Sequence, residues 1–424
     1  MDKKVMMAIV AAVIVVIVVA AAAIVLTKDK GGSDDKEDET PDVPVTVTIS
    51  ASDISVEAGS SAKLNVTVTP ADQASKLVVT PTNTDVYKYT AGTQTIDGLK
   101  KGESTLRLTV GDVSKTVKVS VSGIQVTDHN GKVVELDKPA ERVVVYTKYM
   151  AEAFILMGAT DKVVATSSTV LNDSNYGKYY AGKASVGSST PSSADVAIQN
   201  NADLVILYSG DASIYDASKI PVLEIGASKL NEIHADIVAL GKALGMTEQA
   251  NKILAWFDKY YKMVTDGAAT TDKTKTCALE SWSATRLSMC GDTSTPGTLL
   301  KSIGGTNVFS GGYNYPEAST LIELNPDFYF TVMYNAQWND ADRQNQFNAI
   351  QNRAGWDQID AVKEKNVYNV SNDIIGGIRG VIGGVFFLSL LNSNYSSYSV
   401  SDMMAEYNAI AGTEFDPNLV YKMS

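Results

Sequence analysis

The stretch from Asn231 to Asp266 reads NEIHADIVALGKALGMTEQANKILAWFDKYYKMVTD, and it decides how the rest of the chain is interpreted. Its first half predicts a helix over Asn231–Leu244 that ends at Gly245, because glycine readily adopts the left-handed conformation that closes a helix. Its second half predicts a longer helix to Asp266, with Thr247 as its cap. The expected buried face of this longer helix follows the i, i+3, i+4 spacing and consists of Ala250, Ile253, Leu254, Phe257, Tyr260, Tyr261 and Val264.

Alternating strand and helix patterns lie on both sides of the long helix. Before it, ERVVVY (141–146), DKVVATS (161–167) and DLVILYSG (203–210) are apolar strand patterns separated by helix patterns. After it, KTCALESW (275–282) and KNVYNVS (365–371) continue the series. Each series predicts a mainly parallel sheet. A long helix between two such blocks predicts a strut that joins two α/β lobes, whereas a core helix of one α/β domain is the alternative.

Length, charge and motifs exclude several classes of protein. The 424 residues exceed one typical domain, and the net charge of −12 argues against nucleic acid as a partner. The only two histidines, His129 and His234, stand in no Glu-x-x-His frame, so we expect neither a bare transition-metal site nor a cofactor. No phosphate-binding glycine motif and no G-x-S-x-G turn occurs in the sequence. We therefore expect a protein that is not an enzyme.

The first 43 residues differ from the rest of the chain. Val5–Leu26 is an uncharged run of 22 residues, which is long enough to cross a bilayer. We expect residues 1–27 to be a membrane anchor with the bulk of the chain outside the cell, and a cleaved signal peptide is the alternative. Residues 28–43 hold seven acids and three lysines and almost no apolar residue, which is typical of an extended acidic linker.

Residues 44–122 have the pattern of an all-β domain. Short runs rich in Val and Thr alternate with period two between glycine and proline turns, which predicts a β-sandwich. ISVEAGSSAKLNVTVTP (54–70) and GLKKGESTLRLTV (98–110) resemble the bacterial Ig-like group 2 domains of surface proteins. No ionisable cluster stands out there, so a spacer role is favoured over ligand binding.

Several segments after residue 123 resemble the substrate-binding proteins of ABC importers for iron–siderophore, haem and cobalamin. They include VTDHNGKVVELDKPAERVVVY (126–146), MAEAFILMGATDKVVAT (150–166), LIELNPDFYF (321–330) and AGWDQIDAVKEKNVYNVS (354–371). The resemblance implies a monomer that captures a metal chelate and delivers it to an ABC permease and its ATPase. It also implies two α/β lobes, 124–246 and 267–424, joined by a single helix over 247–266.

Members of this family commonly dock on permease arginines through one acid on each lobe. Those positions fall on Ala194 and Ser319 in this chain, so the resemblance passes the role to the neighbouring Asp195 and Glu317. The alternative is that both acids only begin helices.

Side chains at the carboxyl ends of the predicted strands are the expected ligand contacts, because ligands bind there in parallel sheets. Aromatic rings supply flat walls, and hydroxyl groups supply orientation. Arg379 lies in IIGGIRGVIGG (374–384), where the glycines allow close approach, and it is an expected counter-charge together with Lys148. The predicted ligand-binding residues are Tyr146, Lys148, Tyr149, Ser167, Ser188, Tyr208, Trp282, Tyr313, Tyr315, Tyr334, Trp338 and Arg379.

The two cysteines can pair if the second block begins with a hairpin. With Ser283–Ala284 as a two-residue turn, Cys277 and Cys290 would lie opposite each other at a distance that a disulfide can bridge. Two buried thiols are the alternative.

Two other functions stay open at this point. A surface adhesion protein could bind glycan or protein through the α/β part, and a chelatase could share the two-lobed fold. Chelatases place His or Glu in the cleft, so the scarcity of His disfavours that class.

Overall fold

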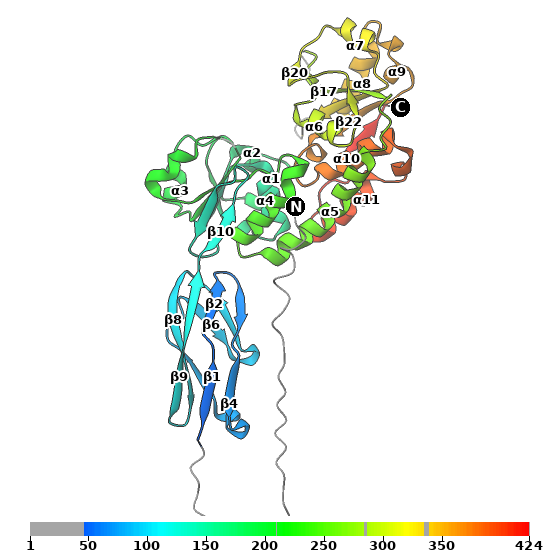
Figure 1. Ribbon diagram of the computed structural model, residues 1–424. Coiled ribbons are helices and arrows are strands. Elements are labelled where there is room, and N and C mark those ends of the chain that lie inside the picture. Colours follow the sequence, from blue (N-terminus) through cyan, green and yellow to red (C-terminus); the bar gives the residue numbers. More distant parts are fainter. Residues whose placement is uncertain (1–45, 209, 284–285, 335–338, 424) are drawn as a thin grey trace, which may run out of the picture. The chain divides into compact units, whose positions relative to one another are not determined.

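The computed structural model describes residues 46–208, 210–283, 286–334 and 339–423 (Figure 1). The expected anchor over Val5–Leu26 and the acidic linker lie outside these residues. Within the described ranges, no helix combines the length and the apolar character that a bilayer crossing requires.

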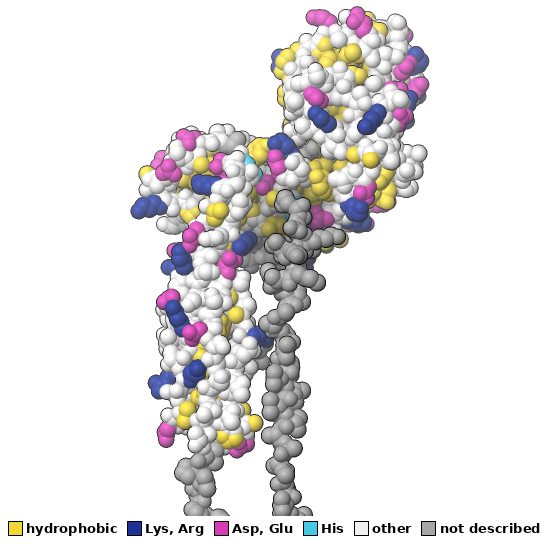
Figure 2. All heavy atoms as spheres, viewed as in Figure 1, with side chains coloured by type: hydrophobic (Ala, Val, Ile, Leu, Met, Phe, Trp, Pro, Cys, Tyr) yellow, Lys and Arg dark blue, Asp and Glu magenta, His cyan; other side chains and the backbone are white. Residues whose placement is uncertain are grey.

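The first described module, up to Ser122, is all-β. Its strands are β1 (Thr48–Ala51), β2 (Ile54–Glu57), β3 (Ser61–Lys63), β4 (Val66–Thr69), β5 (Val78–Pro81), β6 (Tyr87–Thr90), β7 (Thr95–Gly98), β8 (Gly102–Val110) and β9 (Val113–Ser122). They form sheets of order β2-β9-β8-β5, β3-β7-β6 and β1-β4. Leu106 and Val117 from one sheet and Tyr87 and Ile96 from another are fully buried in a shared core, because period-two alternation turns them inward. In Figure 2, acidic and basic side chains are mixed over the visible face of this module.

A hairpin of β10 (Ile124–Thr127) and β11 (Val133–Leu136) follows. Five residues, among them Asn130 and Gly131, separate the two strands. Asp128 stabilises this loop, because its Oδ1 accepts hydrogen bonds from the backbone N–H groups of Asn130 and Lys132, both at 2.9 Å.

The next block, called the first lobe, has a parallel sheet of order β14-β13-β12-β15-β16. Its elements are β12 (Val143–Val145), α1 (Lys148–Leu156), β13 (Val163–Thr166), α2 (Ser168–Leu171), β14 (Ala184–Ser185), α3 (Asp195–Gln199), β15 (Leu204–Leu207), β16 (Val222–Glu224) and α4 (Leu230–Ala243). Every residue of β12 and β15 is apolar and buried, as expected for a parallel sheet covered on both faces.

The predicted long helix is present as α5 (Thr247–Ala268), 22 residues that follow α4 and connect the two sheets in sequence (Figure 1). Gly245 has φ of +65° and closes α4 as predicted. Two details differ from the expectation. Thr247 is the first helical residue, preceded by Met246 as an uncapped N-cap, and Tyr261 is only partly buried.

The second lobe is built on a mixed sheet of order β20-β18-β17-β21-β22-β23, with β19 also paired to β17. Its strands are β17 (Thr276–Ser281), β18 (Met289–Cys290), β19 (Thr306–Asn307), β20 (Tyr313–Asn314), β21 (Phe328–Met333), β22 (Val367–Ser371) and β23 (Val420–Lys422). Its helices are α6 (Thr295–Ser302), α7 (Ala318–Leu324), α8 (Asp340–Asn352), α9 (Asp360–Lys363), α10 (Gly380–Leu391) and α11 (Val400–Ala411). The apolar α10 packs on α5 and is buried on almost all sides.

The expected disulfide does not form. Glu280 pairs with Met289 in the β17–β18 ladder, so Cys290 lies across from Leu279 and is out of register with Cys277 by two residues. Both cysteines are buried free thiols. The predicted register was wrong because the connection between these strands is longer than a two-residue turn.

Candidate functional site

Tyr149 lies where the two lobes meet. It belongs to the first turn of α1, which begins just after β12 and is capped by the Thr147 hydroxyl. Its ring packs on a turn of the second lobe: a Cβ built on Gly376 would lie 2.5 Å from the Tyr149 hydroxyl, and one on Gly377 would lie 2.4 Å from the ring. Only glycine leaves room for this contact. Ile375 of the same turn lines a cavity, and we call the region of Tyr149, the 375–377 turn and this cavity the cleft.

The second lobe carries three exposed tyrosines close to one another in charge interaction. Tyr313, Tyr315 and Tyr334 are 49%, 55% and 45% exposed. Partial burial raises the pKa of Tyr313 to about 12, and the charge interaction and hydrogen bond with Tyr334 add to the effect. Burial also raises the pKa of Tyr149, and the electrostatic neighbours that contribute include Tyr334. We call Tyr149, Tyr313, Tyr315 and Tyr334 the tyrosine cluster; all four were predicted as ligand contacts.

Arg286 supplies a cation to this cluster and was missed in the sequence. Its guanidinium carbon lies 4.0 Å from the centre of the Tyr315 ring, within the range of a cation–π contact. The strand-end rule that selected Trp282 would have found it, since Arg286 lies between the same two strands, β17 and β18.

The two cations that were predicted to face a ligand are paired with carboxylates of the chain in the structure. Arg379 is 1% exposed and its Nε and Nη2 donate to the carboxylate of Glu152 at 3.0 and 3.1 Å. Lys148 is largely buried, and its Nζ lies 2.9 Å from Asp373 and 3.1 Å from Asp173. A charge removed from water needs an opposite charge, and here carboxylates of the chain provide it.

Three side chains of the first lobe that were predicted as polar ligand contacts are placed by the structure as follows. Tyr146 is buried and its hydroxyl shares a 2.7 Å hydrogen bond with that of Tyr215. Ser167 is fully buried at the start of α2, and its hydroxyl has no hydrogen-bond partner among the described residues. Ser188 is exposed, but its hydroxyl donates to the Thr190 carbonyl at 2.7 Å. We therefore place Tyr146 in the core rather than in the cleft.

The remaining predicted aromatic residues are distributed as follows. Tyr208 is partly exposed, with its ring 5.9 Å from that of His129. Trp282 is half-buried directly after β17, and its backbone N–H donates to Val332 at 3.0 Å. Trp338 lies outside the described residues.

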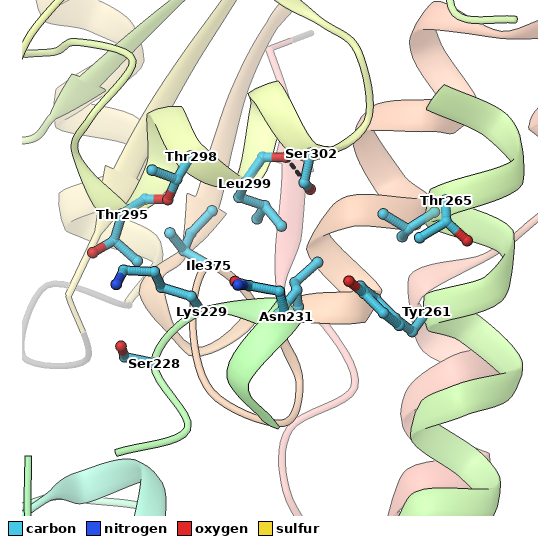
Figure 3. A pocket seen from close by; sticks show the side chains of 12 residues that line it. Ser228, Lys229, Asn231, Tyr261, Thr265, Thr295, Thr298, Leu299, Ser302 and Ile375 are labelled. Carbon is cyan, nitrogen blue, oxygen red and sulfur yellow. Dashed lines mark hydrogen bonds between the residues drawn. The ribbon is translucent and has the colours of Figure 1, made fainter. Parts of the chain in front are cut away.

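A cavity of about 290 Å³ lies between the start of α4, the C-terminal part of α5 and α6 (Figure 3). Ile375 forms part of its wall and is followed by Gly376, which contacts Tyr149, so the cavity and the tyrosine cluster meet at the 375–377 turn. Its polar groups include the Ser228 hydroxyl, which is buried without a hydrogen-bond partner among the described residues. Lys229 at its edge is paired with Glu232 at 2.8 Å. Sequence reasoning missed the cavity because three separate helices form it.

Residues 143–374 match the sequence profile of the family described as Periplasmic binding protein, and this range is more than half of the chain. The chain belongs to the periplasmic binding protein family. A comparison with curated protein sequences finds no match.

Solved structures of other proteins have a similar fold. The TroA-like periplasmic binding protein FepB of Veillonella parvula has a TM-score of 0.61 at 19% identity, covering 71% of this chain and 100% of that chain. Molybdate-bound MolA of Haemophilus influenzae has a TM-score of 0.56 at 16% identity, covering 69% and 99%. The Ni-His complex of Helicobacter pylori CeuE has a TM-score of 0.53 at 16% identity, covering 70% and 98%. These likenesses establish the two-lobed α/β fold.

Proposed function

We propose that this periplasmic binding protein captures a metal chelate and delivers it to an ABC importer. The observation that carries the proposal is the tyrosine cluster, in which Tyr149 of the first lobe has Tyr334 of the second as an electrostatic neighbour, and Tyr334 in turn neighbours Tyr313. Flat rings with oriented hydroxyl groups suit a large planar or chelated ligand. Arg286 gives the site one cation, which favours a chelate with negative charge.

Iron–siderophore, haem and corrinoid complexes are the candidate ligands. MolA and CeuE, which share the fold, were solved with molybdate and with nickel and histidine. These ligands support a metal-related cargo. They do not select one chelate, so the choice rests on a binding screen.

Delivery would use Asp195 and Glu317. Asp195 is the first residue of α3 and Glu317 is the N-cap of α7, and both are exposed. An exposed carboxylate on each lobe suits docking on two arginine sites of a permease. Both positions also suit acids that only begin helices, so transport must be measured in an Asp195→Ala, Glu317→Ala variant whose ligand affinity is unchanged.

The N-terminal third would place the binding domain outside the cell membrane. In this proposal residues 1–27 are the membrane anchor, residues 28–43 a tether, and residues 44–122 an Ig-like spacer. The antiparallel pairing and shared core of the all-β module support the last assignment.

A binding screen tests the function directly. We expect one member of a panel of ferric hydroxamate, ferric catecholate, haem and corrinoid to bind, and a Tyr313→Ala, Tyr315→Ala variant to lose that binding. Tyr398→Ala is the matched control, because Tyr398 is equally exposed but contacts Tyr395 rather than the cluster. Binding of a glycan or peptide in place of every chelate would assign the protein to the adhesion class instead.

A further inference from the structure

A buried ion pair between the side chains of Glu152 and Arg379 joins the two lobes. Glu152 lies in α1 of the first lobe and Arg379 immediately precedes α10 of the second, 227 residues away. The two side chains are 2% and 1% exposed. The hydroxyl groups of Tyr176 and of Tyr407, in α11, also donate to the Glu152 carboxylate, so each of its oxygens has two donors.

A second buried ion pair lies beside the first. Lys148 of α1 contacts Asp373, which follows β22, at 2.9 Å. Asn175 of the first lobe donates to the other oxygen of Asp373 at 2.8 Å. The Nη1 atom of Arg379 is 3.6 Å from the same carboxylate, which links the two pairs. We call Lys148, Glu152, Asp373 and Arg379 the interlobe clamp.

Burial makes the clamp sensitive to the arrangement of the lobes. Taking charges out of water costs free energy, which is recovered only when each charge keeps a close partner. The cation of Glu152, Arg379, lies on the opposite lobe. Lys148 has one carboxylate partner on each lobe, Asp173 on its own and Asp373 on the other. A separation of the lobes would therefore remove the cation of Glu152 and one of the two partners of Lys148, which disfavours open arrangements.

The same residues hold the floor of the cleft. Asp373 lies two residues before Ile375, and the 375–377 turn carries both the contact with Tyr149 and one wall of the cavity. Lys148 directly precedes Tyr149 in α1. We propose that Lys148, Glu152, Asp373 and Arg379 are positioning residues that keep the cleft preformed before any ligand arrives. The proposal rests on the proposed function only in taking this cleft as the binding site.

Distances between spin labels test the clamp without ligand. Labels at Ile198→Cys on α3 and Leu324→Cys on α7 report on the two lobes, because both positions are exposed while Cys277 and Cys290 are fully buried. With the clamp intact we expect one narrow distance distribution. A Glu152→Gln, Arg379→Met variant removes both charges together, so no buried charge is left unpaired, and it should add a second, longer population.

A buried ion pair within one lobe is the matched control. Glu280 of β17 and Arg353, which follows α8, lie 3.3 Å apart, and Glu280 is fully buried. The Glu280→Gln, Arg353→Met variant should have the same narrow distance distribution as the labelled parent chain. Equal broadening in this control would mean general loosening rather than a clamp, and it would overturn the proposal.

Further outcomes keep the proposal open to refutation. A broad distribution in the labelled parent chain, or a narrow one in the clamp variant, contradicts it. Should the double variant fail to fold, Tyr407→Phe keeps every charge and removes one donor to Glu152, and it must then speed amide exchange in the 375–377 turn. Unchanged exchange would also overturn the clamp. If the distances behave as expected but ferric hydroxamate, ferric catecholate, haem and corrinoid all fail to bind, only the proposed function is lost.

Discussion

The guanidinium of Arg286 lies over the ring of Tyr315, with 4.0 Å between the guanidinium carbon and the ring centre. Both side chains are exposed. This pair differs from Lys148 and Arg379, whose charges are already balanced by carboxylates of the chain. Among the described residues that contact the tyrosine cluster, Arg286 is therefore a cation that a ligand can approach.

Replacing Arg286 by Gln should lower the affinity for an anionic ligand more than the affinity for a neutral one. Loss of a charge pair in a partly desolvated cleft should weaken an anionic chelate by about tenfold, or about 1.4 kcal/mol. A neutral chelate should keep its affinity within a factor of about two. Titration calorimetry on both chelates measures the difference, with Arg107→Gln in the all-β module as the control. Equal weakening of both ligands would show that Arg286 acts through packing.

The parts of the fold that could be predicted are those that local pattern determines. The 3.6-residue period of apolar residues predicted α5, and Gly245 predicted the break between α4 and α5. Both predictions succeed because helix faces and helix ends depend on residues close in sequence. The buried strands β12 and β15 followed from apolar runs in the same way.

The errors have a common physical cause. Arg379 was expected to meet a ligand, yet its environment is set by Glu152, 227 residues earlier, and no local pattern reports such a pairing. The register of Cys277 and Cys290 depended on a turn length that the sequence leaves open. Tyr149, Tyr313, Tyr315 and Tyr334 were selected because topology alone brings strand ends together, and their role as ligand contacts stays a prediction.

The two thiols should be unreactive in the folded protein. Burial raises the pKa of Cys290 to about 11 and also raises the pKa of Cys277. Only the thiolate reacts, so a maleimide at pH 8 should label neither residue in native protein. Denatured protein should react at both, without prior reduction. Intact mass spectrometry counts the labels. If denatured, unreduced protein takes up no maleimide, the two cysteines form a disulfide after all.

Acid should weaken the fold partly through Asp373. Burial alone would raise the pKa of this carboxyl, but Arg379 and Lys148 outweigh that effect and hold it below its usual value. A lowered pKa in the folded state gives stability that is present above the unfolded pKa of about 3.9 and is lost as the pH falls through the folded pKa.

The Asp373→Asn variant tests this pH dependence. It should lower the free energy of unfolding at pH 7 by about 3 kcal/mol, because it leaves buried cations less well paired. Its stability should then fall less steeply than that of the parent below about pH 4. Urea unfolding across this range measures both effects. The exposed Asp357→Asn is the control, and a parallel pH profile in Asp373→Asn would contradict the assignment.

Tryptophan emission should report ligand binding through Trp282. This residue is half-buried at the end of β17, whereas Trp256 and Trp356 are buried in the packing of the chain. A ferric chelate in the cleft absorbs visible light and should quench the nearest indole most strongly. The quenching should saturate with ligand and become smaller in Trp282→Phe, while the emission of Trp256 and Trp356 remains as an internal reference.

A gallium complex of the same chelator separates quenching from a change in structure. Gallium keeps the charge and shape of the ferric complex but lacks its visible absorption, so it should compete for the site and leave most of the emission in place. If gallium and iron complexes quench equally, the signal comes from rearrangement around Trp282. If neither changes the emission but both bind by calorimetry, the ligand lies away from Trp282, and the cavity between α4, α5 and α6 becomes the place to test, beginning with Ser228→Ala and Tyr261→Phe.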